Sequence, residues 1–302
     1  MKQSAKAMVF GSFVADSLAL GVHWIYDTGK IDGSFGRISE LLAPGEGSYH
    51  PGKSRGGFTH YGDQALHLLN HLQRHGGVFE LEAYGQDWQK FMTGYQGYRD
   101  RASKATLLNL DSGKSASECG SPSTDLGGAA RIAPLVYAYR KNPQALAEVV
   151  KAQTALTHNS PSALAGARFL ADSCLAVLAG ASPREAFEQA LAGGVADPQL
   201  AARIVSALGE EQGSVRQKVG EFGQACGIGS ALPGAVYAIV SSPDSLEEAL
   251  IETVMAGGES AARGMVVGMV LGAHLGMASI PERWLRGLSA GAEIAAALDA
   301  LP

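Results

Sequence analysis

Apolar residues spaced as in amphipathic helices recur along the whole chain, and no polar–apolar alternation is long enough for a convincing strand. Between residues 63 and 74, the apolar positions 65, 68, 69 and 72 mark one helical face. Several later segments start with Ser-Pro, Asn-Pro or Asp-Pro, in which a capping residue precedes proline in the first turn. The pattern therefore predicts an all-α protein. The expected helices cover 7–21, 63–74, 81–95, 143–157, 162–178, 183–192, 198–208 and 244–255, and another starts near Ala129.

Composition favours closely packed helices. Hydrophobic residues make up 46% of the 302 residues and charged residues 18%, which is enough apolar material for a large core. Aromatic residues account for only 7%, whereas sheets favour β-branched and aromatic side chains. Neither an internal repeat nor a low-complexity linker divides the chain. We expect one compact multi-helix bundle over residues 1–302.

Two apolar segments have some features of membrane signals, and we interpret both as buried helices. The first, 7–21, follows two lysines, but Asp16 interrupts it and the apolar pattern continues to Trp24. The second, 264–280, is shorter than the roughly 20 residues that a membrane span needs. Its glycines at 264, 268, 272 and 276 would line one stripe of a helix. That stripe predicts close approach of a neighbouring helix, either within the bundle or across a dimer interface.

Charge and cysteine content exclude several functional classes. The net charge is −5 and lysine and arginine form no cluster, so we expect neither a nucleic-acid nor a membrane partner. The three cysteines lie far apart without a CxxC motif, which argues against a disulfide framework or a zinc knuckle. A reducing cytoplasm is the expected location.

Two long irregular stretches, 33–57 and 111–128, are rich in Gly, Ser and Pro, and such loops often border a site. Polar residues gather beside them. Asp16 interrupts an apolar helix and is followed by His23 and Trp24; an acid there marks either a site or a satisfied core group. Asp63 lies in the polar segment 59–64 and is either a site residue or a carboxylate that caps the following helix.

Two further polar segments lie later in the chain. Residues 125–131 contain a Gly-Gly pair whose amides would suit phosphate, although an ordinary turn explains it as well. Further along the chain, Thr157-His158-Asn159 belongs to the same group of candidate polar residues. In residues 257–263, Glu259 either forms a surface pair with Arg263 or points into a cleft with Asp63. Neither GxSxG nor HExxH is present.

In this order, these segments resemble the ADP-ribosylglycohydrolase family from Gly11 to about Leu288. Residues 11–21 look like its opening Gly-Asp-Ala-Leu-Gly helix, and 127–135 are similar to its Gly-rich Met-Arg-Ile-Ala-Pro-Leu element. Residues 156–158 match its Leu-Thr-His. Residues 257–259 and 280–284 look like its Gly-Gly-Asp-Thr-Asp segment and its closing Ile-Pro.

The resemblance implies an all-α bundle with two Mg²⁺ ions between a Thr-Asp-Asp segment and the late Asp-Thr-Asp segment. The ions would orient ADP-ribose and activate water for cleavage of an N- or O-glycosidic bond, because a hard cation prefers several oxygen ligands. This chain departs from that pattern. Residues 61–63 read Tyr-Gly-Asp and residues 259–261 read Glu-Ser-Ala, so two carboxylates are missing. His23 takes the place of an early Glu, and Leu126 lies near an expected Asn.

These departures predict one Mg²⁺ ion held by Asp63, Glu259 and Ser260, or none, rather than two. They also argue against the ADP-ribosyl-arginine cleavage that the family name suggests. We expect a hydrolase acting on a small, ADP-ribose-like substrate, with Asp63, Glu259, His60 and His23 as catalytic residues. A carboxylate would activate water, and a histidine would act as acid or base. The expected substrate-binding residues are Asp16, Trp24, Tyr61, Gln64, Asp125, Gly127, Gly128, His158 and Asn159.

The alternative is a protein that keeps the fold without the chemistry. Residues 60–64 also resemble the branch that includes the J-type lens crystallins, and the missing carboxylates fit a pseudoenzyme, a ligand-binding protein or a structural protein.

Overall fold

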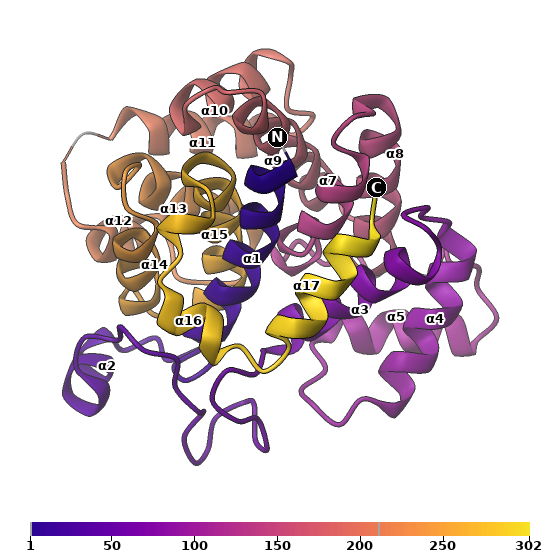
Figure 1. Ribbon diagram of the computed structural model, residues 1–302, viewed down its shortest axis with the longest axis horizontal. Coiled ribbons are helices and arrows are strands. Elements are labelled where there is room, and N and C mark those ends of the chain that lie inside the picture. Colours follow the sequence, from indigo (N-terminus) through magenta and orange to yellow (C-terminus); the bar gives the residue numbers. More distant parts are fainter. Residues whose placement is uncertain (1, 211) are drawn as a thin grey trace.

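The protein is built from α-helices, as the sequence predicts. The structure, a computed structural model, describes residues 2–210 and 212–302, and over these residues β-structure is limited to two isolated bridges. Figure 1 shows the helices in chain order. The first nine are α1 (Lys2–Ala19), α2 (Thr28–Phe35), α3 (His60–Arg74), α4 (Leu81–Gly94), α5 (Arg101–Asp111), α6 (Gly127–Ala130), α7 (Ala133–Tyr139), α8 (Pro143–Thr157) and α9 (Pro161–Leu178). Next come α10 (Pro183–Ala192), α11 (Pro198–Gly209), α12 (Val215–Phe222), α13 (Ile228–Ser241), α14 (Leu246–Met255), α15 (Ser260–Leu275), α16 (Glu282–Gly287) and α17 (Gly291–Ala300), with a 3₁₀ turn, η1 (Met277–Ser279), after α15.

The centre of the fold is the pair formed by α1 and α15, which pack against each other along most of their length. Every residue of α15 from Ser260 to Ala273 is buried, as expected for a helix that is apolar on all sides. Gly264, Gly268 and Gly272 face α1, so the predicted stripe packs within the protein, whereas Gly276 is the C-cap of α15 and lies outside the stripe. A Cβ built on Gly268 would lie 2.1 Å from the carbonyl oxygen of Gly11, which leaves no room for a side chain. The backbones of the two helices therefore touch directly.

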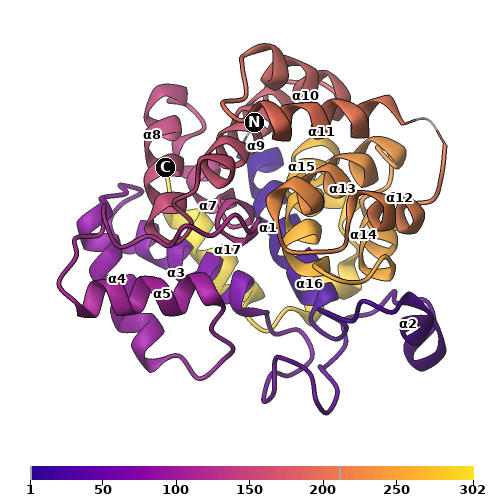
Figure 2. The same cartoon turned by 180° about the vertical axis from the view of Figure 1, so that it is seen from behind.

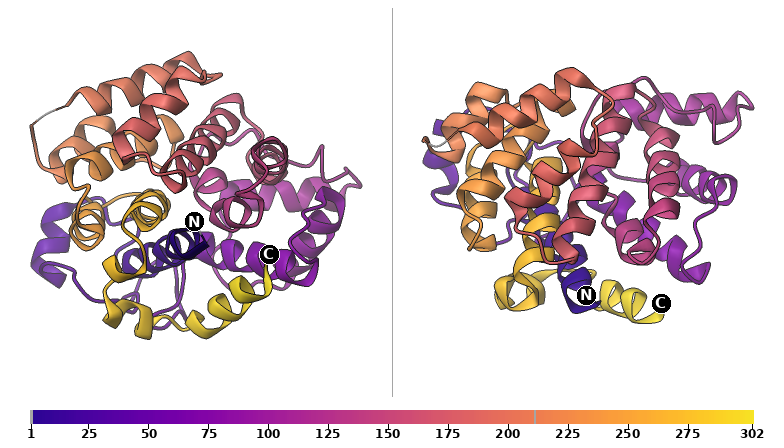
Figure 3. Two further views of the ribbon diagram at one scale, coloured as in Figure 1. Left: turned by 45° about the horizontal axis from the view of Figure 1, so that its top comes forward. Right: turned by 90° about the horizontal axis from the view of Figure 1, so that it is seen from above.

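The other helices surround this pair in two groups. Helices α9, α13 and α14 pack against α15, while α3 and α7 pack against α1 (Figures 1 and 2). Helix α17 returns to α3, and the ammonium group of Lys2 donates a hydrogen bond to the carbonyl oxygen of Leu301. Figure 3 shows the two chain ends on the same side of the molecule.

Capping residues begin the helices where the sequence predicts them. Ser182 and Glu185 form a capping box, and Asn142, Ser160 and Asp197 cap helices that start with proline. Ser245 caps α14 by accepting from the amide of Glu248. The irregular stretch between α2 and α3 is confirmed, but α2 occupies its first residues.

The helix with the length and hydropathy of a membrane span is α9, of which 56% is buried inside the bundle. It packs against α8, α10 and α15. The two segments singled out in the sequence form α1 and α15, and both are buried core helices, as predicted.

Candidate active site

The four polar segments of the sequence meet at one end of the α1–α15 pair. The chain after α1 is joined to the turn before α15 by two backbone hydrogen bonds, one from Trp24 to Gly258 and one from Gly258 to Ile25. The first turn of α3 reaches the same place, because the Tyr61 hydroxyl donates to Glu259. Gly127 packs against the Tyr61 ring and brings the third segment alongside.

Glu259 is the centre of this cluster. It is the N-cap of α15 and accepts hydrogen bonds from the Ala262 amide at 3.1 Å, the Trp24 indole at 2.9 Å and the Tyr61 hydroxyl at 3.1 Å. Its side chain is fully buried, and no lysine or arginine of the described chain forms an ion pair with it. The positive end of the α15 dipole favours its charge. A carboxylate is thus fixed by three donors where no ordinary salt bridge holds it.

Arg263 does not form the surface pair with Glu259 that the sequence left open. The guanidinium is fully buried and donates to the carbonyl oxygens of Thr253 and Gly257. Gly257 and Gly258 have φ angles of 68° and 63°, and a Cβ on Gly258 would lie 2.4 Å from the Gln224 carbonyl oxygen. The arginine and the glycine pair therefore hold the turn that presents Glu259.

Three buried histidines lie next to Glu259. His23 follows α1, His50 belongs to the loop before α3, and His60 is the first residue of α3. A ring nitrogen of each lies within 4.8 Å of a ring nitrogen of the other two. Nε2 of His23 is 3.7 Å from Oε1 of Glu259. Burial, reinforced by the other two histidines, lowers the pKa of His50 to about 2.

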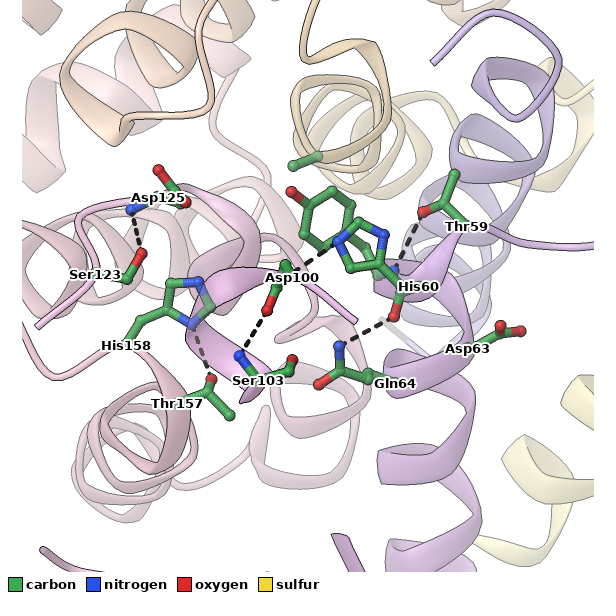
Figure 4. Close-up of polar contacts among 12 residues, drawn as sticks. Thr59, His60, Asp63, Gln64, Asp100, Ser103, Ser123, Asp125, Thr157 and His158 are labelled. Atoms are coloured by element: carbon green, nitrogen blue, oxygen red, sulfur yellow. Dashed lines mark hydrogen bonds and ion pairs between the residues drawn. The ribbon is translucent and has the colours of Figure 1, made fainter. Parts of the chain in front are cut away.

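Asp100 was not predicted from the sequence. It caps α5 by accepting from the Ser103 amide at 2.6 Å, and its other oxygen lies 3.4 Å from Nε2 of His60 (Figure 4). Burial raises the pKa of Asp100, but the contact with His60 and the nearby charges of His60 and His158 outweigh burial and lower it. The carboxylate therefore stays ionised and orients the His60 ring.

Asp63 lies apart from these groups. Its carboxylate pairs with Lys53 and accepts from the Tyr95 hydroxyl, and Figure 4 shows it pointing away from His60 and Asp100. Two helical positions separate Asp63 from Tyr61, which turns their side chains about 200° apart around α3. The predicted metal set of Asp63, Glu259 and Ser260 is therefore not assembled. His60 and Tyr61 occupy the side of α3 that faces Glu259.

Asp16 is the satisfied core group that the sequence allowed as an alternative to a site residue. Its two oxygens accept from the Thr59 amide at 2.8 Å and the Thr59 hydroxyl at 2.6 Å. Burial raises its pKa to about 7, in spite of both bonds. The Thr59 oxygen also accepts from the Tyr61 amide and caps α3. Asp16 thus fixes the first turn of α3 against α1.

The remaining predicted residues divide into core and surface positions. Gln64 donates to the His60 carbonyl oxygen and accepts from Trp88 and from buried Arg131, so its polar atoms are used inside the core. His158 bonds Thr157 through Nδ1 at 2.8 Å, and burial lowers its pKa to about 4. Asn159 is exposed.

Gly127 and Gly128 allow close packing. A Cβ on Gly127 would meet the Tyr61 ring at 2.3 Å, and one on Gly128 would meet the His158 ring at 2.8 Å. Asp125 is half-buried, and burial followed by the charges of Glu259 and Asp100 raises its pKa. Asp125 is therefore the residue of the third segment whose carboxylate interacts electrostatically with the site.

A cavity of about 390 Å³ opens beside the cluster. It lies between residues 23–27 and residues 45–49, and its walls include His23, Trp24 and Tyr49. Trp24 has a φ angle of 66°, a backbone conformation that is strained for a residue with a side chain. The Trp24 ring meets Tyr49 and Tyr98 edge-on, with centroids 4.9 and 5.0 Å away. Such an aromatic wall suits a planar ring in a ligand.

Three of these neighbours were not predicted from the sequence, although a signal for each was present. His50 and Tyr49 stand in the long Gly/Pro-rich loop that the sequence marked as bordering a site, directly before Pro51-Gly52. Asp100 lies three residues before Ser103 and could have been identified as a helix cap. Their approach to His60 depends on tertiary contacts that no local pattern records.

Comparison with known proteins places these features in context. The family model described as ADP-ribosylglycohydrolase matches residues 1–302. Crystallin J1A of Tripedalia cystophora is 28% identical over 97% of this chain and 94% of its own, and crystallin J1B of the same animal is 26% identical over the same shares. The bovine (Bos taurus) ADP-ribosylhydrolase ARH3 is 27% identical over 52% of each chain. A solved structure titled "ADP-ribosylglycohydrolase-related protein complex" superposes with a TM-score of 0.77 at 25% identity, over 99% of this chain and 97% of the other.

Proposed function

The chain belongs to the ADP-ribosylglycohydrolase family, and on this premise we propose that it is a hydrolase for an N- or O-ribosyl bond, or a related C–N bond, of a small substrate. The family is one of hydrolases that act on ADP-ribosylated substrates. We propose that residues 1–302 act as one domain in the cytoplasm. The observation that carries the proposal is the buried carboxylate of Glu259, which is held by Tyr61 and by Trp24, a residue that lines the cavity.

Burying the Glu259 carboxylate has a free-energy cost. Burying a charge without a partner of opposite charge destabilises a protein, so such groups persist mainly where function requires them. Glu259 keeps two side-chain donors on Oε2, which leaves Oε1 with the Ala262 amide and the approach of His23. In the proposed reaction, Glu259 accepts a proton from the attacking water.

A histidine supplies the second proton transfer. His60, oriented by Asp100, is the candidate to protonate the leaving group, because burial lowers the pKa of His23 well below its usual value and leaves that ring neutral. Trp24, Tyr61 and Asp125 would contact the substrate, and the exposed ring of Tyr49 would cover a planar portion such as a nucleobase. We assign no catalytic part to Asp63, because Lys53 and Tyr95 already occupy its carboxylate.

Magnesium does not fit the residues that the structure brings together, although the family normally uses divalent metals. Within residues 2–210 and 212–302, no three carboxylates place their oxygens within 4.8 Å of one another. Ser260 stands beside a single carboxylate, that of Glu259. Mg²⁺ prefers several oxygen ligands, and this position offers a single carboxylate. The proposed reaction therefore contains no step that depends on Mg²⁺.

The test is release of ADP-ribose or ribose from N-linked and O-linked conjugates, followed by chromatography. We expect turnover by the wild type, a loss of about 100-fold or more in Glu259→Gln, and none in Glu188→Gln, an exposed acid on α10 that serves as the matched control. Full activity of Glu259→Gln would refute the assigned base.

A second function has one observation in its favour. The two relatives that match nearly the whole chain are named crystallins, and the altered carboxylates are compatible with a ligand-binding or structural protein. Calorimetry with ADP-ribose separates the two functions. Binding of ADP-ribose without turnover of any conjugate would support the non-catalytic alternative.

A further inference from the structure

Three histidines with free ring nitrogens converge in the protein interior. The side chains of His23, His50 and His60 are buried, and a nitrogen of each lies within 4.8 Å of the others. Among the described residues, five of their six ring nitrogens have no hydrogen-bond partner. The sixth, Nδ1 of His23, accepts a long bond of 3.4 Å from the Ala261 amide.

Unpaired buried nitrogens of this kind destabilise a fold. Among the described residues, 21 buried side-chain atoms have no hydrogen-bond partner, and five of them belong to these three rings. The clustering of these nitrogens favours a ligand that takes the free lone pairs of His50 and His60 and displaces the long Ala261 contact of His23. A metal ion does so, because neutral imidazole is the commonest metal ligand in proteins.

The spacing of the rings is close to that of three imidazoles on one ion. Three nitrogens at about 2.0–2.1 Å from a tetrahedral centre place the ring centroids about 5 Å apart. The centroids here are 5.4 Å apart for His23 and His50, 5.6 Å for His50 and His60, and 6.3 Å for His23 and His60. The two pairs that involve His50 are therefore close to this spacing, whereas His23 and His60 would have to approach each other by about 1 Å.

Carboxylates stand where a metal site needs them. Oδ2 of Asp100 lies 3.4 Å from Nε2 of His60, which reproduces the carboxylate–histidine contact that orients metal-ligating imidazoles. Oε1 of Glu259 lies 3.7 Å from Nε2 of His23 and adds a second negative charge. The two carboxylates would balance a divalent cation bound by neutral ligands.

We propose that His23, His50 and His60 bind one divalent metal ion of the zinc class. Three nitrogen ligands select borderline ions such as Zn²⁺ over Mg²⁺, which prefers oxygen. Tetrahedral geometry would leave a fourth position for water or a ligand, and of the three histidines His23 lines the cavity. The site rests on the imidazoles alone, but it shares His60 with the proposed hydrolysis, so an ion bound there would exclude the proton transfer assigned to that residue. It replaces the predicted set of Asp63, Glu259 and Ser260.

The second histidine group of the protein serves as an internal control. His71, His75 and Asp87 also approach within 4.8 Å, but Nδ1 of His71 already bonds Asp87 at 2.7 Å and His75 is exposed. Arg74 donates to the same carboxylate at 2.8 Å. These contacts account for the group without an ion.

The experiment titrates the full chain, freed of metal by a chelator, with Zn²⁺, Co²⁺ and Mg²⁺ in a calorimeter. We expect one Zn²⁺ per chain, visible d–d absorption of bound Co²⁺ typical of tetrahedral nitrogen ligation, and no comparable affinity for Mg²⁺. His50→Ala should weaken Zn²⁺ binding by at least about 100-fold, whereas His75→Ala should leave it unchanged.

Circular dichroism would establish that each variant is folded, and His60→Gln gives a second test that keeps the size of the side chain. Absence of Zn²⁺ binding by the wild type would overturn the proposal. Undiminished binding by His50→Ala and His60→Gln, or loss of binding in His75→Ala, would do the same.

Discussion

The direct contact between α1 and α15 makes a quantitative prediction about two glycines of the same helix. A Cβ on Gly268 would lie 2.1 Å from the carbonyl oxygen and 2.6 Å from the carbonyl carbon of Gly11. A Cβ on Gly264, one turn earlier, would lie 3.5 Å from the carbonyl oxygen of Ala15, which is ordinary van der Waals contact. Both glycines are buried in α15. Their replacement by alanine therefore differs mainly in the room for one methyl group.

The magnitude follows from this difference. Alanine favours a helix interior over glycine by about 1 kcal/mol, and this gain is the same at both positions. Gly264→Ala should therefore be neutral or raise the free energy of unfolding by up to about 1 kcal/mol. Gly268→Ala must push two backbones apart, and overpacking of this kind costs about 1–3 kcal/mol, or more where backbone cannot move. We expect Gly268→Ala to be less stable than Gly264→Ala by about 1–3 kcal/mol.

Urea unfolding monitored by circular dichroism measures this difference, with equal slopes in denaturant as the control for two-state behaviour. Activity or ligand binding provides a second readout, because displacement of α15 moves Glu259 away from Tyr61. Equal unfolding midpoints for the two variants would refute the argument that backbone contact at Gly268 sets the distance between α1 and α15.

Two further predictions concern buried titratable groups. Burial raises the pKa of Asp16 from 3.8 to about 7, so the folded state binds the Asp16 proton more tightly than the unfolded state. The free energy of unfolding should therefore fall as the pH rises from 3.8 to about 7. Urea unfolding should therefore show that the stability of Asp16→Asn relative to the wild type increases by about 2–3 kcal/mol between pH 5 and pH 8. A stability difference that does not change with pH would contradict the raised pKa of Asp16. Burial also raises the pKa of Cys174 to about 12 and that of Cys119 to about 11, so neither thiol should react with a disulfide reagent at pH 8 until the protein is unfolded.

The sequence allowed the fold to be predicted because the evidence for helices is local. Helix α3 shows its apolar face at four positions, and Ser182 and Glu185 form their capping box within one turn. The glycine stripe of α15 predicted a close helix contact, but whether it lay inside the chain or between chains required the structure. Gly268 of the stripe contacts Gly11 of α1, another glycine. The role of Gly11 in this contact can be recognised only once the two helices are known to pack together.

The site was predicted less well, because side-chain direction depends on helix register. Aligning residues 61–63 with a Thr-Asp-Asp segment put Asp63 beside Glu259, but Thr59 caps α3 and turns His60 and Tyr61 toward the site instead. A change of two positions along a helix moves a side chain to the opposite face. The α3 residue that meets Glu259 is therefore Tyr61, a phenol, where the resemblance suggests a carboxylate.

This exchange of ligand type links the two proposals. A site that loses oxygen ligands loses affinity for Mg²⁺, but His50 enters from the loop before α3 and Asp100 from the cap of α5, so the same end of the fold gathers three imidazoles and two carboxylates. A simple decay of the site would leave solvent-filled space or apolar side chains, since nothing would favour buried nitrogens without partners. The structure instead keeps Glu259, His23 and His60 buried, with Nε2 of His23 3.7 Å from Oε1 of Glu259 and ring nitrogens of His23 and His60 within 4.8 Å of each other. Such an arrangement is what the proposed binding of a nitrogen-preferring ion on this scaffold requires.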